Sequence, residues 1–182
     1  MAILEDKQIL AYCRHNDEAS LIYPFHESLL QPCSYDVCLG EVYMTERLRP
    51  FRPVDPWGKK WRERRASNGK IVVWPKQLIL ASTIERVRLT GRVCARVTGL
   101  NTLGCSGIAV HATADHVDPG YRGNLTLQIH NLGWTPIVLR VGMPIAQVIF
   151  AQTEFMPRTT YGSPGLGSAY QDQSGPAAAA QV

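Results

Sequence analysis

Long apolar runs, paired cysteines and a strong net charge are all missing from this sequence of 182 residues. No run approaches the roughly 18 apolar residues of a membrane-spanning helix. The five cysteines are odd in number and form no CxxC pair, which argues against a disulfide framework and a zinc ribbon. The opening residues, MAILEDKQIL, lack the basic-then-apolar pattern of a signal peptide. We therefore expect a cytoplasmic protein that makes no contact with a membrane.

The net charge of +4 is mild, but the basic residues are unevenly spread. They are densest in residues 59–65, KKWRERR, with Trp57 and Trp61 interleaved and Lys70 nearby. A basic run with aromatic side chains among the charges can contact nucleic acid or another phosphate-rich partner. More often such a run is a solvated loop. Nucleic-acid binding between Lys59 and Lys70 is therefore an alternative hypothesis and not the leading one.

Short segments of β character, separated by turn residues, make up most of the chain, and 45% of its residues are hydrophobic. Alternation of polar and apolar side chains is typical of strands with one buried face. We predict a short helix at residues 4–15, an extended segment at 21–25, and strands at 34–44, 71–74, 77–81, 86–89, 91–97, 124–130, 136–140 and 145–150. Many short strands with almost no helix predict an all-β fold, a distorted barrel or sandwich of the jelly-roll kind.

Two segments do not fit the strand pattern. Residues 45–70 are rich in Pro, Arg and Lys and suggest a long basic connection or insertion. From about residue 158 the sequence turns to Gly, Ser, Ala, Gln and Pro, a composition that cannot bury a core. We therefore predict one β-barrel domain at residues 1–157 and a flexible tail at 158–182. Tyr170 and Gln173 give this tail groups able to stack and hydrogen-bond, so that it could close over a ligand.

The turn at residues 118–123, DPGYRG, is the most concentrated candidate site. Its proline fixes φ, its glycines tolerate unusual backbone angles, and the alternating residues 124–130 follow directly. Asp118, Tyr121 and Arg122 should therefore lie on a tight turn held by strands on either side. A carboxylate, an aromatic face and a guanidinium on a rigid turn can bind a charged, planar ligand. The plainer alternative is an ordinary β-hairpin with a solvated carboxylate.

Several motifs, in this order, resemble those of the dCTP deaminases and their dUTPase relatives. The matching segments are residues 31–40 (QPCSYDVCLG), 110–123 (VHATADHVDPGYRG), 131–133 (NLG), 142–150 (GMPIAQVIF) and 170–176 (YQDQSGP). They cover most of the chain outside residues 45–70, and several motifs in order are far more specific than one. The resemblance points more to the deaminase branch than to the dUTPases.

The resemblance implies a distorted β-barrel of the dUTPase type that forms a homotrimer, with active sites between subunits. Its ligand would be a pyrimidine deoxynucleoside triphosphate, with Mg²⁺ held at the phosphates, no metal ligands from the protein itself, and no zinc. The implied activity is deamination, in which dCTP and water give dUTP and ammonia.

The resemblance also assigns residues to this ligand. Asp118 would lie near the deoxyribose 3′-hydroxyl, and Tyr121 would lie against the sugar and disfavour a 2′-hydroxyl. Gln147 would hydrogen-bond to phosphate or to neighbouring structure, and the tail would fold over the triphosphate. The substrate-binding positions expected on this basis are Asn101, Thr102, Ala114, Asp118, Tyr121, Gln147, Tyr170 and Gln173.

Departures from the family pattern fall on catalytic positions. The family's water-activating glutamate, ten positions after the Asp of the DPG turn, is Gln128 here, and an amide cannot take a proton near neutral pH. In residues 99–105, GLNTLGC, Leu100 stands for a basic residue and Cys105 for an arginine. A basic pair that would help to hold phosphates is therefore absent. The lysine of the family's tail is Ala169 here.

Three functional hypotheses remain open from the sequence. The first is a dCTP deaminase in which Asp115, His116 or Asp118 replaces the glutamate as base, although structural hydrogen bonding is the plainer role for His111 and His116. The second is a phosphohydrolase of the dUTPase kind that uses Asp118 and Mg²⁺ for in-line attack. The third is a non-catalytic nucleotide-binding or regulatory protein.

Cys105 allows a fourth hypothesis, a covalent nucleophile that attacks a pyrimidine ring. It follows a glycine and replaces an arginine. The plainer alternative is a small buried thiol, because free cysteine usually behaves as a small apolar residue. The candidate catalytic residues are thus Gln128, Asp118, Cys105 and His116.

Overall fold

The computed structural model describes residues 2–47, 53, 55–111 and 113–180 of the chain. Its strands are β1 (Ala2–Ile3), β2 (Ile22–Tyr23), β3 (Leu30–Gln31), β4 (Ser34–Glu46), β5 (Trp61–Arg65), β6 (Lys70–Val73), β7 (Leu78–Arg88), β8 (Val93–Gly99), β9 (Ile108–Val110), β10 (His116–Val117), β11 (Arg122–Asn131), β12 (Ile137–Arg140) and β13 (Pro144–Gln152). The helices are α1 (Asp6–Tyr12) and α2 (Asn101–Cys105), with 3₁₀ turns η1 (Glu27–Leu29) and η2 (Pro56–Gly58). The predicted all-β fold with a short N-terminal helix is confirmed.

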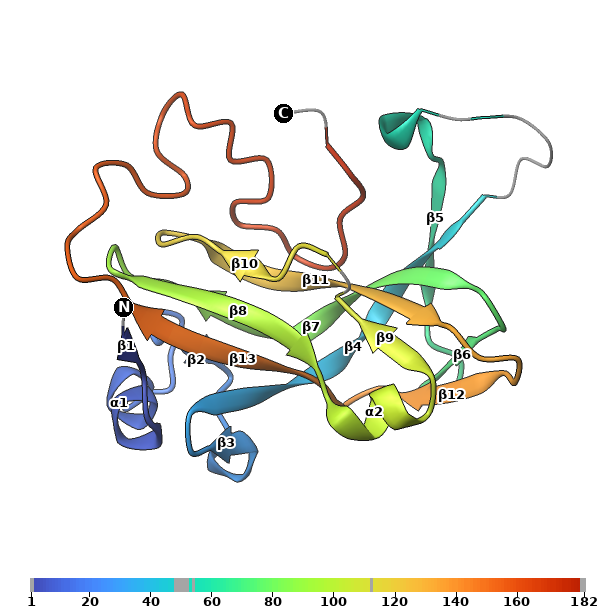
Figure 1. Ribbon diagram of the computed structural model, residues 1–182, viewed down its shortest axis with the longest axis horizontal. Helices are drawn as coiled ribbons and strands as arrows, with labels where there is room; N and C mark the ends of the chain where they lie inside the picture. Colours follow the sequence, from blue (N-terminus) through green and yellow to red (C-terminus); the bar gives the residue numbers. More distant parts are fainter. Residues whose placement is uncertain (1, 48–52, 54, 112, 181–182) are drawn as a thin grey trace.

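Most strands belong to one sheet with the order β10-β8-β13-β4-β7-β11-β9. The short strands β1, β2, β3 and β5 add to it, whereas β6 and β12 form a separate antiparallel pair. The sheet curls on itself (Figure 1), so that one side encloses a core in which Tyr35, Leu127 and Phe150 are fully buried. This curled sheet confirms the predicted distorted barrel.

Strand β11 gives the site a rigid base. Its side chains alternate between buried and half-buried along most of its length, because successive residues of a strand point to opposite faces. Leu127 and Ile129 are fully buried in the core. Thr126 and Gln128 lie on the opposite face. The strand predicted at residues 124–130 is confirmed and is slightly longer than expected.

The prediction of two strands at residues 77–81 and 86–89 was wrong, because the single strand β7 covers both. The polar residues between them are buried and hydrogen-bonded, which the sequence pattern does not reveal. The Glu85 carboxylate accepts a hydrogen bond from Cys38 N at 2.8 Å. The Thr83 hydroxyl donates to Glu85 O at 2.7 Å and accepts from Leu125 N at 3.0 Å. With these partners, polar side chains can continue a buried strand.

Part of the segment predicted as a basic connection is also a strand. Within residues 45–70, strand β5 pairs antiparallel with the end of β4, with Trp61 opposite Glu46 and Arg65 opposite Val42. Its side chains after Trp61 are all exposed, so no apolar alternation marked it. Strands β9 and β10 and helix α2 were not predicted either, because each is only two to five residues long.

The N-terminal helix is shorter than the predicted residues 4–15. It begins after Glu5, whose side chain forms a capping box with Gln8, and it buries Ile9. Beyond its end, the Asn16 side chain accepts a hydrogen bond from Phe25 N at 2.7 Å and donates to Phe25 O at 3.2 Å. The amide thus ties the loop after α1 to the segment after β2.

The tail runs back over the sheet (Figure 1) and meets β11 at its start. Asp172 N donates to Arg122 O at 2.7 Å, and Asn124 N donates to Gln173 O at 3.1 Å. Gln173 thereby forms a parallel bridge with Gly123. These contacts place the tail beside the predicted turn, and the flexibility expected of residues 158–182 remains a prediction.

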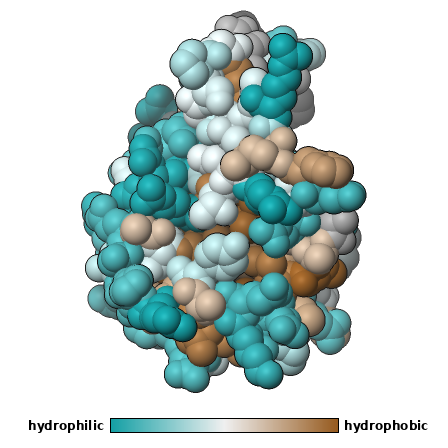
Figure 2. Space-filling view, turned by 90° about the vertical axis from the view of Figure 1, so that its left-hand side faces the viewer, coloured by the Kyte–Doolittle hydropathy of each residue, from teal (hydrophilic) through white to brown (hydrophobic). Residues whose placement is uncertain are grey.

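Apolar side chains are also exposed in several places. Figure 2 views the end of the molecule that carries the N-terminus and shows apolar patches interrupted by hydrophilic side chains. Ile3, Leu10, Phe155 and Met156 are exposed. Among the described residues, no helix has both the length and the apolar character needed to cross a membrane.

Candidate functional site

The turn between β10 and β11 is fixed by backbone hydrogen bonds. Tyr121 N donates to Asp118 O at 3.2 Å, and Gly120 N donates to Leu89 O at the same distance. Gly120 has φ of 95°, an angle that residues with a side chain rarely adopt. A Cβ at this position would lie 2.6 Å from Tyr161 O. The predicted tight turn is present, and its centre requires glycine.

Tyr121 forms a buried wall next to the turn, with 6% of its surface exposed. Its hydroxyl donates to Asn124 O at 2.6 Å. Its ring packs against Tyr161 of the tail at a centroid distance of 5.7 Å. Burial raises the pKa of Tyr121 above its usual value, and the neighbouring Tyr161 adds to the shift. The side chain is therefore a neutral, largely apolar surface near neutral pH.

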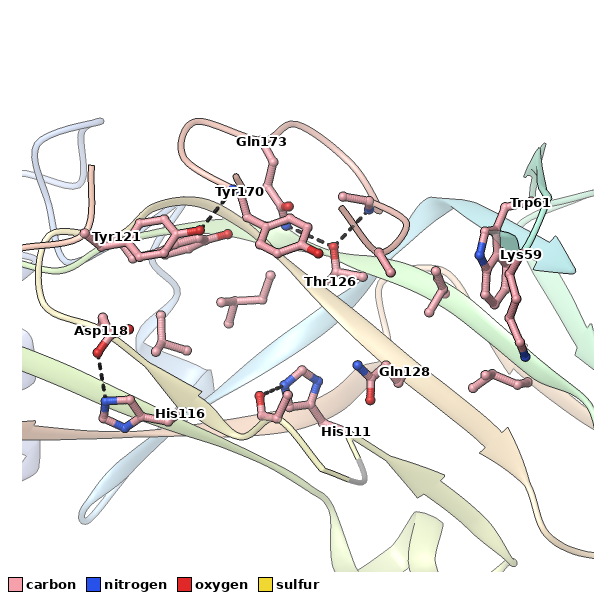
Figure 3. A pocket seen from close by; sticks show the side chains of 18 residues that line it. Lys59, Trp61, His111, His116, Asp118, Tyr121, Thr126, Gln128, Tyr170 and Gln173 are labelled. Atoms are coloured by element: carbon pink, nitrogen blue, oxygen red, sulfur yellow. Dashed lines mark hydrogen bonds and ion pairs between the residues drawn. The ribbon is translucent and has the colours of Figure 1, made fainter. Parts of the chain in front are cut away.

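A cavity of about 450 Å³ lies beside this wall (Figure 3). Its volume suits a small-molecule ligand. The predicted site residues that line it are Ala114, His116, Asp118, Tyr121, Gln128, Tyr170 and Gln173. They come from the loop before β10, from β10, from the turn, from β11 and from the tail, so the fold gathers them from distant parts of the chain.

Asp118 and His116 form a pair at one end of the cavity. His116 Nε2 lies 3.2 Å from Asp118 Oδ1, and more than half of each side chain is exposed. An exposed pair of this kind contributes little to stability. Both side chains can therefore interact with a ligand at small cost to the fold.

Asp115, which the sequence offered as a possible base, does not line the cavity. Its carboxylate accepts a hydrogen bond from Arg96 Nε at 2.8 Å. This hydrogen bond lowers the pKa of Asp115 below its usual value. A carboxylate held by a guanidinium is a poor proton acceptor, which disfavours Asp115 as the base.

His111 lines the cavity although the sequence favoured a purely structural role for it. One ring nitrogen, Nε2, is hydrogen-bonded to Ala114 O. The other, Nδ1, is buried and has no hydrogen-bond partner among the described residues. Burial lowers the pKa of His111 below 6.5, opposed by the Ala114 carbonyl and by Asp115. The ring is therefore neutral near pH 7.

Gln128 lies next to His111 in the cavity (Figure 3). His111 directly follows β9, and its backbone N donates to Gln128 O of β11 at 2.8 Å, one residue beyond the β9–β11 pairing. The Gln128 side chain is half-buried. Its amide can donate and accept hydrogen bonds but cannot act as a general base.

The tail closes one side of the cavity. The Thr126 hydroxyl accepts hydrogen bonds from Gln173 Nε2 and from Ala177 N, both at 3.0 Å. Arg122 forms an ion pair with Asp172, and this hydrogen-bonded guanidinium lowers the pKa of the carboxyl. These contacts hold the tail against β11, and Thr126 was not among the predicted residues. Its position two residues before Gln128 on an alternating strand was the available signal.

The remaining predicted residues lie elsewhere in the chain. Asn101, Thr102 and Cys105 belong to α2 and are exposed. Gln147 is half-buried on β13, where its carbonyl oxygen accepts a hydrogen bond from the Ser34 hydroxyl at 3.5 Å. None of these four lines the cavity within a single chain.

The basic segment also reaches the cavity, which was not predicted. Lys59 and Trp61 line its rim, and the Lys59 ammonium lies 3.2 Å from the Glu46 carboxylate. Arg65 pairs with Glu41, and Arg64 Nε donates to the Thr45 hydroxyl. Within the described part of this segment, several basic side chains therefore already have partners in the protein.

Possible metal ligands are scattered over the described residues. Across these ranges, no group of three or more His, Cys, Asp or Glu side chains is arranged to hold a metal ion. Among the described residues that line the cavity, Asp118 is the one acidic side chain. The expectation that the protein takes no zinc remains a prediction.

A family model described as dCTP deaminase-like matches residues 3–153. The chain belongs to the dCTP deaminase-like family. A relative named dCTP deaminase, dUMP-forming, from Tropheryma whipplei is 36% identical over 166 residues, covering 89% of this chain and 85% of the relative. A dCTP deaminase from Halorubrum lacusprofundi is 35% identical over 182 residues, covering 97% and 89%.

A solved structure gives independent support for the fold. It is that of a 2′-deoxycytidine 5′-triphosphate deaminase from Agrobacterium tumefaciens, with a TM-score of 0.65 and 22% sequence identity. The match covers 84% of this chain and 48% of that chain, so this protein spans about half its length. At this identity the likeness supports the fold and not the activity.

Proposed function

We propose that the protein binds dCTP in the cavity beneath the tail and deaminates it to dUTP and ammonia. The observation that carries the proposal is the convergence of Asp118, Tyr121 and Gln128 on one cavity. The resemblance implies that Asp118 and Tyr121 lie at the sugar and that Gln128 lies at the base. Relatives named dCTP deaminase, 35–36% identical to this chain, support the same substrate.

Each side chain has a role that suits its chemistry. The exposed Asp118 carboxylate accepts a hydrogen bond from the deoxyribose 3′-hydroxyl. The buried Tyr121 ring packs against the sugar and leaves no room for a 2′-hydroxyl. The Gln128 amide orients the reacting group without exchanging protons. Tyr170 and Gln173 cover the ligand from the tail.

Mg²⁺ enters with the triphosphate in this proposal. Phosphate oxygens and water are its preferred ligands, and Asp118 is the carboxylate that could add to them from the described part of the cavity lining. The ion neutralises phosphate charge, and no zinc takes part.

We propose a homotrimer, which would give the exposed residues of α2 a role. Asn101, Thr102 and Cys105 do not reach the cavity of their own chain. In a trimer with sites between subunits, this face of α2 would contact the ligand of a neighbour. Gln147 would then stabilise the sheet or hydrogen-bond to phosphate from its position on β13.

The second candidate is a nucleotide pyrophosphatase that forms dUMP. It is favoured by the open carboxylate of Asp118, and the Tropheryma whipplei relative, a dCTP deaminase, is named dUMP-forming. In this reaction Asp118 activates water for attack on the α-phosphate. The two candidates make different predictions for Asp118→Asn. Deamination predicts a raised KM with a modest effect on kcat, whereas pyrophosphatase activity predicts loss of kcat.

The test is a product panel. Purified protein and Mg²⁺ would be incubated with dCTP, dUTP, their monophosphates and the other common deoxynucleoside triphosphates, and the products separated by ion-pair chromatography. Conversion of dCTP to dUTP with equimolar ammonia is the expected result. Asp6→Asn, which changes an exposed carboxylate on α1, is the matched control for Asp118→Asn.

The other outcomes are equally informative. Conversion of dUTP to dUMP, with no ammonia released from dCTP, would favour the pyrophosphatase. No turnover, together with a thermal shift on addition of one nucleotide, would make the protein a non-catalytic nucleotide-binding member of its family. No turnover, no thermal shift and salt-dependent retention on DNA would favour nucleic-acid binding through the segment from Lys59 to Lys70.

A further inference from the structure

The His111 ring is held in a defined state by its surroundings. Its Nε2 atom is hydrogen-bonded to Ala114 O. Since a carbonyl oxygen can only accept, Nε2 carries the hydrogen, and in a neutral imidazole Nδ1 is then the atom with a free lone pair. This tautomer follows from the partner of Nε2 and fixes which nitrogen can receive a proton.

The atom with the free lone pair is the one that lacks a partner. His111 Nδ1 is buried and unpaired among the residues that the structure describes. Most buried polar atoms in proteins have a hydrogen-bond partner, so an unpaired one requires an explanation. His111 lines the cavity next to Gln128 (Figure 3), so a shift of the Gln128 side chain on ligand binding would let a cavity water reach this atom and supply the partner.

Deamination needs a group that accepts a proton from water, and the neighbouring Gln128 cannot be that group. It occupies the position at which the resemblance expects the water-activating glutamate, and its amide cannot take a proton. His111 and Gln128 are joined by a backbone hydrogen bond of 2.8 Å between His111 N and Gln128 O. Their side chains lie next to each other on the cavity wall (Figure 3). An imidazole at His111 can therefore act on the same water that a carboxylate at position 128 would activate.

Charged and titratable groups from several elements share the cavity with the His111 ring. Asp115, in the same loop, raises the pKa of His111 and is itself paired with Arg96. The other titratable side chains on the cavity lining are Lys59, His116, Asp118, Tyr121, Tyr161 and Tyr170. Asp118 and His116 are paired with each other, and Lys59 with Glu46.

We infer that His111, through Nδ1, is the general base of this protein in place of the glutamate that Gln128 has replaced. The inference rests on the proposed deamination of dCTP. It adds to that proposal the residue that moves the protons, and it assigns Gln128 to the positioning of water.

The reaction balances with this one base. Nδ1 takes a proton from water as the water oxygen forms a bond to C4 of the cytosine ring, and the electron pair of the C4–N3 double bond moves to N3. The imidazolium returns its proton to N3. Nδ1 then takes the proton of the new C4 hydroxyl and delivers it to the amino group. The C4–N bond breaks, ammonia leaves, and C4 retains a carbonyl oxygen. No oxidant, reductant or further reactant is needed.

The decisive variants are His111→Gln, alone and combined with Gln128→Glu. Gln at position 111 keeps an amide hydrogen that can reach Ala114 O but removes the basic nitrogen. A general base contributes about 10²–10⁴-fold to rate, so kcat for dCTP should fall at least about 100-fold, with KM within about 3-fold. The double variant with Gln128→Glu should have a kcat at least about 10-fold higher than that of His111→Gln alone, because a carboxylate again lies beside the water.

Three controls separate catalysis from structure. His130→Gln changes another histidine of the same cross-strand region, whose Nε2 lies 3.2 Å from Lys76 O outside the cavity, and it should leave kcat unchanged. The wild-type protein should lose kcat as the pH falls through a pKa below 6.5, and this acid limb should be absent from the residual activity of His111→Gln. His111 has φ of 60°, an angle that asparagine tolerates well, so His111→Asn replaces His111→Gln if the latter does not fold.

The outcomes separate failure of the proposed deamination from failure of the role of His111. Wild-type protein that binds dCTP without releasing ammonia would overturn both the deamination and the role of His111. An active wild type with a His111→Gln variant that keeps more than about a third of its kcat would overturn the role of His111 alone. A raised KM with unchanged kcat, or no rescue by Gln128→Glu, would make His111 a structural residue and would also overturn the inference.

Discussion

The turn at residues 118–123 and helix α2 carry the two main groups of predicted site residues, and they differ in how the fold holds them. In the turn, Pro119 and Tyr121 are buried, and the tail packs against them. In α2, Leu103 is the one buried residue and the others are exposed. Packing within the chain therefore constrains the residues of the turn and leaves most of α2 free to vary. Departures from the family pattern in α2 consequently change the surface without endangering the fold.

The largest expected difference between the two regions concerns their glycines. Gly120→Ala should destabilise the fold by about 2–4 kcal/mol, because alanine is strained at positive φ. Its Cβ would also lie 2.6 Å from Tyr161 O. Gly104→Ala in α2 should be neutral or stabilise by up to about 1 kcal/mol, since alanine favours helix and no atom lies within 4 Å of the added Cβ. Thermal unfolding of both variants checks this, and equal melting temperatures would contradict it.

Removal of the Tyr121 hydroxyl should have a smaller effect. Tyr121→Phe loses one hydrogen bond to Asn124 O, worth about 1 kcal/mol. The cost should not be higher, because Gln173 Nε2 also donates to this oxygen, which therefore keeps a partner. Chemical denaturation measures the free energy of unfolding. A loss above about 3 kcal/mol would mean that the hydroxyl has a further role.

A smaller effect again is expected from the ion pair between the turn and the tail. Arg122→Gln should change the melting temperature by no more than about 2 °C, because exposed ion pairs contribute little. It should nevertheless speed hydrogen exchange at residues 170–177, since Arg122 bonds Asp172 of the tail. Arg65→Gln, which removes the exposed pair with Glu41, is the matched control and should leave the tail unchanged.

The same pair has a defined pH dependence. Arg122 lowers the pKa of Asp172 below its usual 3.8. The ion pair therefore slows hydrogen exchange of the tail fully at pH values above 3.8. This protection is lost as the pH falls through the lowered pKa of Asp172. Tail exchange that stays equally slow through this acidic range would contradict the ion pair as its anchor.

The smallest effect is expected in α2. Cys105→Ala should change the free energy of unfolding by less than about 0.5 kcal/mol, because the side chain is exposed and touches no feature that would cost more. Denaturation of the reduced protein checks this. The hypothesis of a covalent nucleophile makes a separate prediction, loss of activity in the same variant, and full activity would exclude it.

The sequence predicted the fold well where burial alternates along a strand. Strand β11 was readable because Leu127 and Ile129 alternate with polar residues that face the cavity. Strand β7 was divided in error because Glu85 looks polar in sequence, although its burial is offset by a hydrogen bond from Cys38 N. Strand β5 was missed because it buries almost nothing. Such features depend on tertiary partners that no local pattern contains.

The site was predictable only in part for the same reason. Asp118 and Tyr121 could be assigned from a local turn motif. The role of His111 could not, because it depends on which ring nitrogen meets Ala114 O and on the lack of a described partner for the other. The contribution of Lys59 required the pairing of β5 with β4, which brings a distant segment to the rim of the cavity.

Hydrogen exchange of the protein with and without dCTP and Mg²⁺ tests the central claim most directly, namely that the cavity under the tail is a deoxynucleotide site. The expected result is slower exchange at residues 118–128 and at residues 170–177, with no change in the separate pair β6 and β12. Unchanged exchange in both segments, or slowing confined to strand β5, would show that the nucleotide does not bind beneath the tail.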